Sequence, residues 1–330
     1  MKKILFFFLI VLLNYILITS IVFLFSYFSL VNGKTYNFFW VKSIQEKLYT
    51  RGLRNIWHYQ NDCVKFDKDL LYAPKDGECF FNNFEFESTL NFKNGIRLNY
   101  NNMPETKKND SIALLGDSIT MGWGVNDNET YGAHLEKLMG KKIYNLGTSS
   151  YGSVREIKKL KFSQIYKKVD TILIQYHVND IYENKSLNIE KDYTEQEFNQ
   201  NFKSDKTNLN KTIFFLRTFK TSLRLFFADI LDKINPTANY YYVDFDDHKK
   251  YLEKIIYENL DYDNKNLIVL FIKEPNMKIS NFPISTDIIK YMLVELNEND
   301  FFIIDEHPNV NGHINLANKI YKRLRNLSQN

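Results

Sequence analysis

The sequence predicts an α/β domain built around a mostly parallel sheet, and three observations support this fold class. From residue 111 onward, short apolar runs alternate with segments whose apolar residues recur at helical spacing. Such alternation places helices on both faces of a parallel sheet. The chain has 330 residues, of which 44% are hydrophobic and 16% aromatic, so it can bury a large core.

The charge balance excludes an obvious polyanion partner. The formal net charge is +4, and Lys and Arg are scattered among Asp and Glu along the chain. Proteins that bind nucleic acid usually gather their basic residues on one face or in one stripe. We therefore expect no nucleic-acid partner.

The amino terminus predicts a membrane helix. Residues 4–30 carry no charged side chain, and about 20 apolar residues suffice to cross a bilayer. A cleaved signal peptide has an apolar core of about 7–15 residues and a small-residue exit, which Val31-Asn32-Gly33 matches poorly. We expect residues 1–33 to be an uncleaved signal anchor, with cleavage as the alternative.

The side of the membrane on which the rest of the chain lies is less strongly encoded. Basic residues flank the apolar segment on both sides, so the charge count favours neither orientation. Large domains translocate largely regardless of charge. We expect the body of the chain on the extracytoplasmic (periplasmic) side.

Residues 34–107 predict a juxtamembrane segment followed by a small β-rich module. Aromatic and basic residues mix over 36–59, as in helices near lipid headgroups. Residues 62–101 resemble short strands joined by turns, with Asn94-Gly95 as a hairpin turn.

Two cysteines lie in this module. Cys63 and Cys79 could close a loop as a disulfide, worth about 3 kcal/mol on the chain-entropy model, or could be two separate buried thiols. A disulfide would fit an exported domain, because disulfides persist in oxidising compartments.

Residues 108–330 carry the α/β pattern. Helices are expected at 131–139 and 154–168, and a long polar insertion at about 183–264 contains an apolar helical stretch at 213–234 that could serve as a lid. The expected strands are 112–115, 142–145, 171–176, 267–272 and 301–304.

Four polar clusters follow four of these strands. Because parallel strands end at one edge of the sheet, the clusters should meet there, where open α/β folds bind ligands. Each also has a structural explanation, because Ser, Asn and Asp cap helices and Gly permits tight turns. The clusters are Asp117 and Ser118 in GDSIT, Gly147 in NLGTSSYG, Asn179 and Asp180 in QYHVND, and Asp305 and His307 in DEHPNVNGH.

Together the clusters contain what acyl-ester chemistry requires. A serine such as Ser118 is a weak nucleophile until a base, here His307, takes its proton. Asp305 could hold the imidazole in the correct tautomer. The backbone N–H groups of Ser118 and Gly147 and the side-chain amide of Asn179 could form an oxyanion hole.

These four ordered blocks resemble the SGNH (GDSL-type) hydrolases, and the anchor suggests membrane-anchored bacterial members. The resemblance runs from about residue 111 to the carboxyl terminus, and the four residues of the family name would be Ser118, Gly147, Asn179 and His307. It implies a flavodoxin-like three-layer α/β/α domain and an esterase with a Ser-His-Asp triad and no metal or organic cofactor. The implied substrate is an O-acylated, typically O-acetylated, small molecule, carbohydrate or cell-surface polymer.

Two positions depart from the family pattern. His177 stands where the third block usually has Gly, which brings a bulky titratable side chain beside the oxyanion region. Asp305 lies two residues before His307, whereas many members have three, and Asp180 is an alternative partner for the histidine. Asp117, His177 and Asp180 are further candidates to lie near substrate.

Two other functions remain open at this point. The same serine could pass its acyl group to a sugar hydroxyl, which would make the protein an O-acyltransferase of a surface polysaccharide. Alternatively, the fold could bind a glycan without catalysis. A metal site made of Asp180, Asp305 and His307 matches no standard zinc spacing, so we expect no metal.

Overall fold

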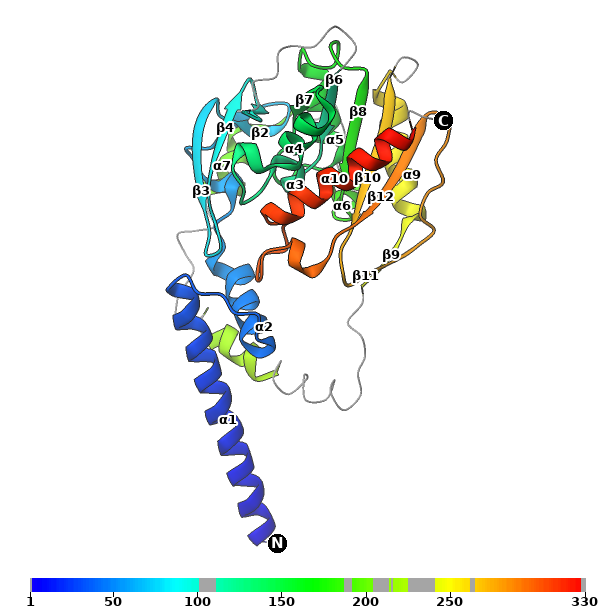
Figure 1. The fold of residues 1–330 in the computed structure, drawn as a ribbon. Coiled ribbons are helices and arrows are strands. Elements are labelled where there is room, and N and C mark those ends of the chain that lie inside the picture. Colours follow the sequence, from blue (N-terminus) through cyan, green and yellow to red (C-terminus); the bar gives the residue numbers. More distant parts are fainter. Residues whose placement is uncertain are drawn as a thin grey trace.

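A mixed eight-stranded sheet, with strand order β12-β10-β8-β6-β7-β5-β4-β3, forms the centre of the molecule. The structure is a computed structural model that describes residues 2–100, 111–186, 192–203, 214, 216–224, 241–261 and 265–327. Figure 1 shows the sheet above a long amino-terminal helix. The parallel strands are β6 (Ser111–Leu115), β7 (Lys142–Asn145), β8 (Thr171–Tyr176), β10 (Asn266–Lys273) and β12 (Ile289–Glu295).

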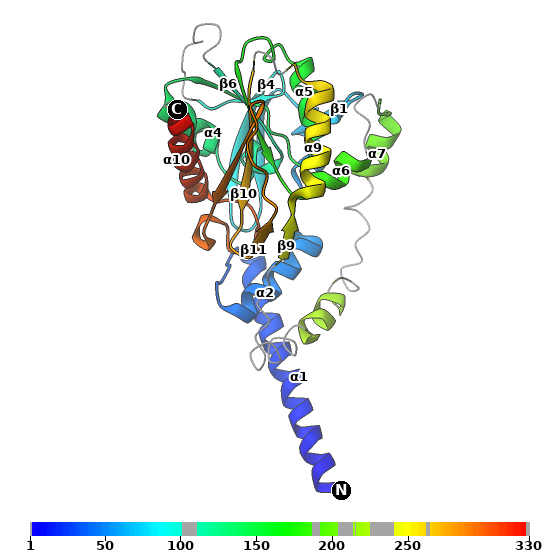
Figure 2. The same ribbon diagram turned by 90° about the vertical axis from the view of Figure 1, so that its right-hand side faces the viewer.

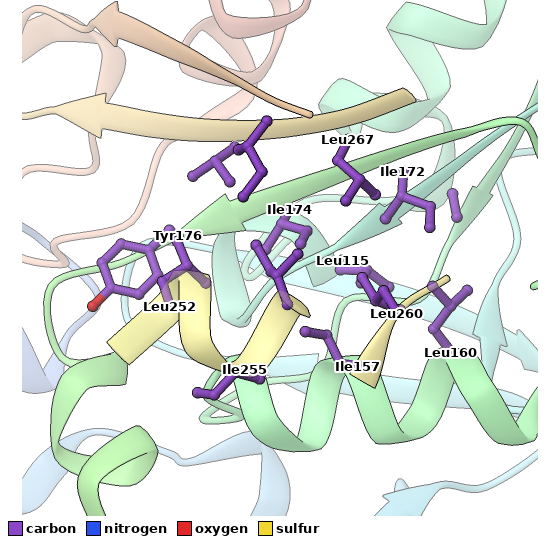
Figure 3. Close-up of a cluster of buried hydrophobic side chains, with 14 of the residues drawn as sticks. Leu115, Ile157, Leu160, Ile172, Ile174, Tyr176, Leu252, Ile255, Leu260 and Leu267 are labelled. Atoms are coloured by element: carbon purple, nitrogen blue, oxygen red, sulfur yellow. The ribbon is translucent and has the colours of Figure 1, made fainter. Parts of the chain in front are cut away.

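Helices cover both faces of the parallel strands (Figure 2). One face packs against α4 (Tyr131–Met139) and α10 (Val310–Leu327), and the other packs against α5 (Ser153–Phe162) and α9 (Phe245–Asn259). Figure 3 shows the second of these cores, in which side chains of α5 and α9 meet those of the sheet. Renumbered along the chain, the parallel strands run 2-1-3-4-5, the flavodoxin-like order. The predicted three-layer α/β/α fold class is confirmed.

Local sequence explains where the helices begin and end. Helix α4 starts after Thr130, whose side chain accepts a hydrogen bond from the N–H of Ala133 at 3.0 Å. It ends at Gly140, which has a left-handed φ of 64°. In α10, Leu316, Ala317 and Ile320 lie on one buried face, as expected for apolar residues at helical spacing.

Two sequence expectations are wrong. The last parallel strand is β12, and 301–304 is not a strand, because Phe301 makes only an isolated bridge with Pro308 and Ile304 packs near the amino-terminal helices. Helix α9 belongs to the layer that covers the sheet, because Leu252 and Ile256 are buried in its core. The expected insertion therefore overlaps a core helix.

One expectation lies mostly outside the described residues. This is the apolar stretch 213–234, of which 216–224 is helical. The remaining short elements are α3 (Ser118–Met121), η3 (Asp127–Glu129), α6 (Asp180–Ser186), α7 (Glu195–Lys203), β9 (Tyr241–Asp244), β11 (Met277–Ser280) and η4 (Glu298–Asp300).

The β-rich segment joins the central sheet. Strands β3 (Gly77–Asn82), β4 (Glu87–Lys93) and β5 (Ile96–Arg97) extend it in antiparallel fashion, and β5 pairs with β7. The turn between β4 and β5 has positive φ at both Asn94 and Gly95, as Asn-Gly hairpins require. A separate hairpin, β1 (Val64–Asp67) and β2 (Leu71–Pro74), is linked to β3 by a disulfide between Cys63 and Cys79.

Helix α1 (Lys2–Val31) is the one helix in the described residues that is long and apolar enough to cross a membrane. Its first half is exposed, whereas Phe23 and Leu30 pack against α2 (Phe39–Leu48). The chain then passes through a wide π-helical turn, η1 (Tyr49–Leu53), and a short 3-10 turn, η2 (Trp57–Tyr59), to reach the sheet.

Candidate active site

A cavity of about 440 Å³ opens at the carboxyl ends of β6 and β8. These two strands are neighbours at the switch point of the sheet, which is where ligands bind in such folds. Ser118 and Asn179, which follow these strands, both line the cavity. Residues from the amino-terminal segment, including Arg54 and His58, complete its wall.

Ser118 is the first residue of α3 and does not cap it. The cap is Asp117, whose Oδ1 accepts the N–H of Ile119 at 3.0 Å. The preceding Gly116 has a φ of 152°, and a Cβ there would lie 2.1 Å from Thr120 Oγ1. Only glycine fits this crowded turn, which delivers the Ser118 hydroxyl to the cavity.

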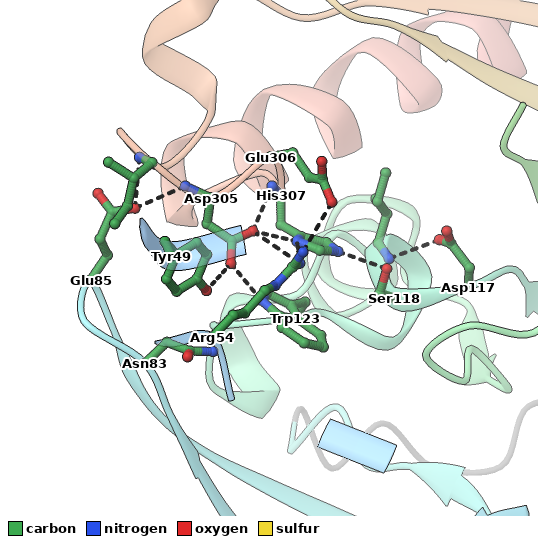
Figure 4. A network of polar contacts seen from close by, with 12 residues as sticks. Tyr49, Arg54, Asn83, Glu85, Asp117, Ser118, Trp123, Asp305, Glu306 and His307 are labelled. Atoms are coloured by element: carbon green, nitrogen blue, oxygen red, sulfur yellow. Dashed lines mark hydrogen bonds and ion pairs between the residues drawn. The ribbon is translucent and has the colours of Figure 1, made fainter. Parts of the chain in front are cut away.

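The structure brings Ser118, His307 and Asp305 together (Figure 4). His307 Nε2 lies 2.7 Å from Ser118 Oγ, and His307 Nδ1 lies 2.5 Å from Asp305 Oδ1. The backbone N–H of His307 also donates to Asp305 Oδ1 at 3.0 Å. The two-residue spacing therefore lets the aspartate bind both the ring and the backbone of the histidine.

The loop that carries Asp305 is held by a carboxylate from the β3–β4 turn. Glu85 accepts the backbone N–H groups of Ile303, Ile304 and Asp305 at 2.8, 2.9 and 3.1 Å. Three N–H groups that the loop would otherwise leave unpaired are thus satisfied by one side chain. This segment of the β-rich region was not expected to support the site.

Three further side chains contact the aspartate and histidine. Trp123 Nε1 donates to Asp305 Oδ2 at 3.1 Å, and its ring stacks on that of His307 with centroids 4.7 Å apart. The Tyr49 hydroxyl donates to the same Oδ2. Arg54 Nη2 lies 3.0 Å from His307 Nδ1 and 3.5 Å from Asp305 Oδ1. Sequence reasoning missed Tyr49 and Arg54, because they precede every motif and have no local signature.

These contacts keep Asp305 ionised. Burial alone would raise the pKa of its carboxyl, but His307, Arg54 and the Tyr49 hydroxyl outweigh burial and hold that pKa well below its usual range. Burial, together with the Asp305 charge, raises the pKa of Tyr49, so its hydroxyl remains a donor.

Gly147 does not line the cavity. Its N–H donates to Asn145 Oδ1 at 3.0 Å, and a Cβ there would lie 2.2 Å from the backbone nitrogen of Met121. The glycine therefore allows two backbones to approach each other. The residues of this loop that reach the cavity are Ser149 and Ser150, and Ser150 has a left-handed φ of 63°.

Asn179 and His177 lie together in the cavity wall. Asn179 Oδ1 is 2.7 Å from His177 Nδ1, so the acceptor end of the amide is occupied. His177 Nε2 lies 3.6 Å from Glu274 Oε1, and Glu274 Oε2 accepts the hydroxyl of Tyr241 at 2.9 Å. A chain of polar contacts thus runs from Tyr241 to the Asn179 amide.

The other acidic candidates serve the local backbone. Asp180 Oδ2 accepts the N–H of His177 at 3.1 Å, and Asp180 makes no hydrogen bond to His307. Burial and the nearby Asp117 raise the pKa of Asp180. Among the residues that the structure describes, no group of three His, Cys, Asp or Glu side chains is placed to hold a metal ion.

Comparison with known proteins gives only distant structural similarity. No protein-family model and no curated protein matches the chain. A protein of the G-D-S-L family from Desulfitobacterium hafniense DCB-2 is 13% identical with a TM-score of 0.31, over 65% of this chain and 99% of that one. An acetyl xylan esterase from Butyrivibrio proteoclasticus is 15% identical with a TM-score of 0.31, over 68% and 65%. A carbohydrate esterase is 12% identical with a TM-score of 0.37, over 80% and 85%. At these values, the function has to be argued from the geometry of the site.

Proposed function

We propose that the protein is a serine-dependent carboxylester hydrolase, with Ser118 as nucleophile, His307 as general base and Asp305 as the group that orients the histidine. The single observation that carries this proposal is the 2.7 Å contact between Ser118 Oγ and His307 Nε2 inside a cavity. A nucleophile must lie within hydrogen-bond reach of its base, and the base must be oriented by a third group.

The proposed reaction has two halves. His307 Nε2 takes the Ser118 proton as Oγ attacks the ester carbonyl carbon, and the resulting imidazolium gives that proton to the leaving alcohol. Water then attacks the acyl-serine, with His307 as base, and the tetrahedral intermediate collapses to release the acid and the free serine. Asp305 stabilises the imidazolium in both halves.

The tetrahedral oxyanion needs fixed donors. We assign these to the N–H of Ser118 and to Nδ2 of Asn179, because the acceptor end of that amide already faces His177. The Gly147 N–H is occupied by Asn145, so we assign the third donor to the N–H of Ser150 in the cavity wall.

The substrate class is proposed from the family resemblance and the character of the cavity. At about 440 Å³, the cavity admits a small acyl group with part of a sugar, and polar side chains such as Asn179 and Glu274 line it. We propose an O-acyl, typically O-acetyl, ester of a carbohydrate or cell-surface polymer.

We further propose that α1 anchors the protein and that its catalytic domain is extracytoplasmic. The 30-residue apolar helix supports the anchor. The Cys63–Cys79 disulfide supports an oxidising compartment. An alkaline phosphatase reporter fused after Asn330 should be active, because that enzyme needs an oxidising compartment. An inactive phosphatase fusion, together with a green fluorescent protein fusion at the same position that fluoresces in the cytoplasm, would contradict this placement.

Replacement of the serine tests the reaction. Ser118→Ala should lower kcat on p-nitrophenyl acetate and on an acetylated glycan by about 10³-fold or more, and should abolish labelling by a fluorophosphonate. Ser163→Ala is the matched control, because among the described residues that hydroxyl bonds the carbonyl of Leu160 alone. An inactive wild type, or equal activity in Ser118→Ala, would contradict hydrolysis by this serine.

One observation favours acyl transfer as a second candidate. A neighbouring cavity of about 310 Å³ shares Glu274 and Glu306 with the first, so an acceptor sugar has room next to the cavity that contains Ser118. Mass spectrometry of the products formed from p-nitrophenyl acetate and an unacetylated glycan separates the two functions, because a transferase would pass the acetyl group to the glycan whereas a hydrolase would release acetate alone.

A further inference from the structure

We infer that Tyr49 and Arg54 are positioning residues for Asp305 and His307, so that these two side chains of the juxtamembrane segment support the catalytic site. This inference rests on the proposed function. It is drawn from contacts made by a segment more than 250 residues away in sequence from the groups that it holds.

The first observation is that the Asp305 carboxylate is fully engaged. Oδ1 receives the backbone N–H and ring nitrogen of His307, whereas Oδ2 receives the hydroxyl of Tyr49 and Nε1 of Trp123. Tyr49 and Asp305 are both buried, so this contact has almost no surface open to solvent. Loss of the hydroxyl would leave Oδ2 with one donor and allow the carboxylate to rotate away from the imidazole.

The second observation is that Arg54 covers the remaining side of the pair. Its guanidinium lies 4.7 Å above the Trp123 ring, and Nη1 lies 3.1 Å from Glu306 Oε1. Its Nη2 contacts both His307 Nδ1 and Asp305 Oδ1. Only 14% of its side chain is exposed, so it shields the contact between aspartate and histidine from solvent. A charge in a partly buried position acts more strongly than one in water.

The third observation is the backbone that presents both side chains. The N–H of Arg54 donates to the carbonyl of Tyr49 at 2.9 Å, which closes the wide turn η1. Such i to i+5 turns are uncommon and often occur at functional sites. Leu48 and Tyr49 pack with Ile304, next to the aspartate, and with Phe23 and Leu30 of α1. One cluster therefore connects the end of α1 to the catalytic loop.

The test compares Arg54→Ala and Tyr49→Phe with a matched control in the full-length protein. Arg51→Ala removes the same charge from the same turn, but Arg51 is exposed and its one side-chain hydrogen bond among the described residues goes to the half-buried Thr221. We expect Arg54→Ala to lower kcat by up to about 100-fold and Tyr49→Phe to lower it by about 10-fold. In each variant, KM should change by a smaller factor than kcat. Arg51→Ala should stay within about twofold of wild type.

The pH profile separates positioning from a merely structural role. The charged and titratable groups facing Asp305 are His307, Arg54, Tyr49 and the nearby Glu85. Arg54 places a positive charge 3.0 Å from His307 Nδ1, so Arg54→Ala should make protonation of the catalytic base easier and move the acid limb of kcat/KM to higher pH. Arg54→Lys keeps the positive charge but not the planar guanidinium group. It should restore part of the activity and move the acid limb part of the way back toward its wild-type pH.

Failure of the positioning role and failure of the proposed hydrolase function give different results. Equal activity and pH profiles in Arg54→Ala and Arg51→Ala would overturn the inference while Ser118→Ala still abolished activity. Loss of activity with an unchanged acid limb and a lowered Tm would also overturn it, because that combination indicates damaged folding. If Ser118→Ala retained activity, the proposed function itself would fail.

Discussion

His177 joins two parts of the cavity wall through its two ring nitrogens, one near Asn179 and the other near Glu274. Burial by itself lowers the pKa of this imidazole. The contact with Glu274 and the carboxylates of Asp117 and Asp180 outweigh burial and raise the pKa to about 10. The side chain that replaces the expected glycine is therefore a cation at neutral pH, beside the amide proposed to bind the oxyanion.

This raised pKa predicts a pH-dependent stability. An unfolded histidine releases its proton near pH 6.5, whereas folded His177 keeps it until about pH 10. The resulting stabilisation is complete below pH 6.5 and is lost as the pH rises through 10. Urea unfolding at pH 6, 8 and 10 should show this decline in wild type and a shallower one in His177→Gln.

His134→Gln is the control for that measurement. Burial lowers the pKa of His134, so its replacement should leave the decline between pH 6 and 10 in place. Equal slopes in wild type and His177→Gln would show that His177 does not hold a proton in this range.

At the scale of single elements, the loop after β7 depends on the absence of a side chain. Gly147→Ala should destabilise the protein by about 1–3 kcal/mol, because its Cβ would meet backbone atoms of Thr120 and Met121 that cannot move independently of α3. Activity should fall as well, since α3 begins with Ser118.

Chemical denaturation and esterase assays on Gly147→Ala check this expectation. Gly140→Ala is the comparison: a Cβ there meets no atom within 4 Å, although its φ of 64° adds backbone strain. A loss of activity in Gly140→Ala as large as in Gly147→Ala would argue against transmission through α3.

Several elements were predictable because their sequences carry their own physical signal. Buried parallel strands read as nearly continuous apolar runs, as in β6, β8 and β10, whereas β7 (KIYN) alternates buried with half-buried residues. The run at 301–304 carries the same signal, but its side chains divide among three clusters, and only Ile303 and Ile304 pack with the amino-terminal helices. Strand β12 was missed because IKYMLVE mixes charged residues with apolar ones at the edge of the sheet.

The candidate site likewise contains residues that the sequence predicts and residues whose roles it does not reveal. Ser118, Asn179 and His307 belong to recognisable sequence blocks, and the structure gathers them around one cavity. The hydrogen bond that occupies Gly147 depends on the side chain of Asn145, and the roles of Tyr49, Arg54 and Glu85 depend on tertiary packing. No periodicity or motif encodes contacts between segments so far apart in sequence.

At the scale of the whole molecule, we propose an anchor at 1–33, a juxtamembrane and β-rich region at 34–107 and a hydrolase domain at 108–330. The last two share the central sheet, because β5 pairs with β7. We expect them to unfold together in one transition.

Two truncations test how the amino-terminal helix contributes to the stability and activity of the rest of the protein. Deletion of residues 2–13 removes only exposed residues and should leave esterase activity unchanged. Deletion of residues 2–33 also removes Phe23 and Leu30, which pack beside Tyr49, and should cost about 2–4 kcal/mol of unfolding free energy and part of the activity. Equal stability of the two truncated proteins would contradict this packing.

The junction between α1 and α2 has a consequence for how substrate is met. Gln45 Nε2 donates to Ser29 Oγ at 3.0 Å and to the carbonyl of Lys34 at 2.8 Å, which ties α2 to the end of α1. If α1 crosses a bilayer, the domain has no slack tether and stands at a fixed height and tilt above the lipid. Catalysis would then be confined to a thin layer next to the membrane. The rate of substrate turnover would depend on lateral diffusion in the membrane and on the number of enzyme molecules per unit of membrane area.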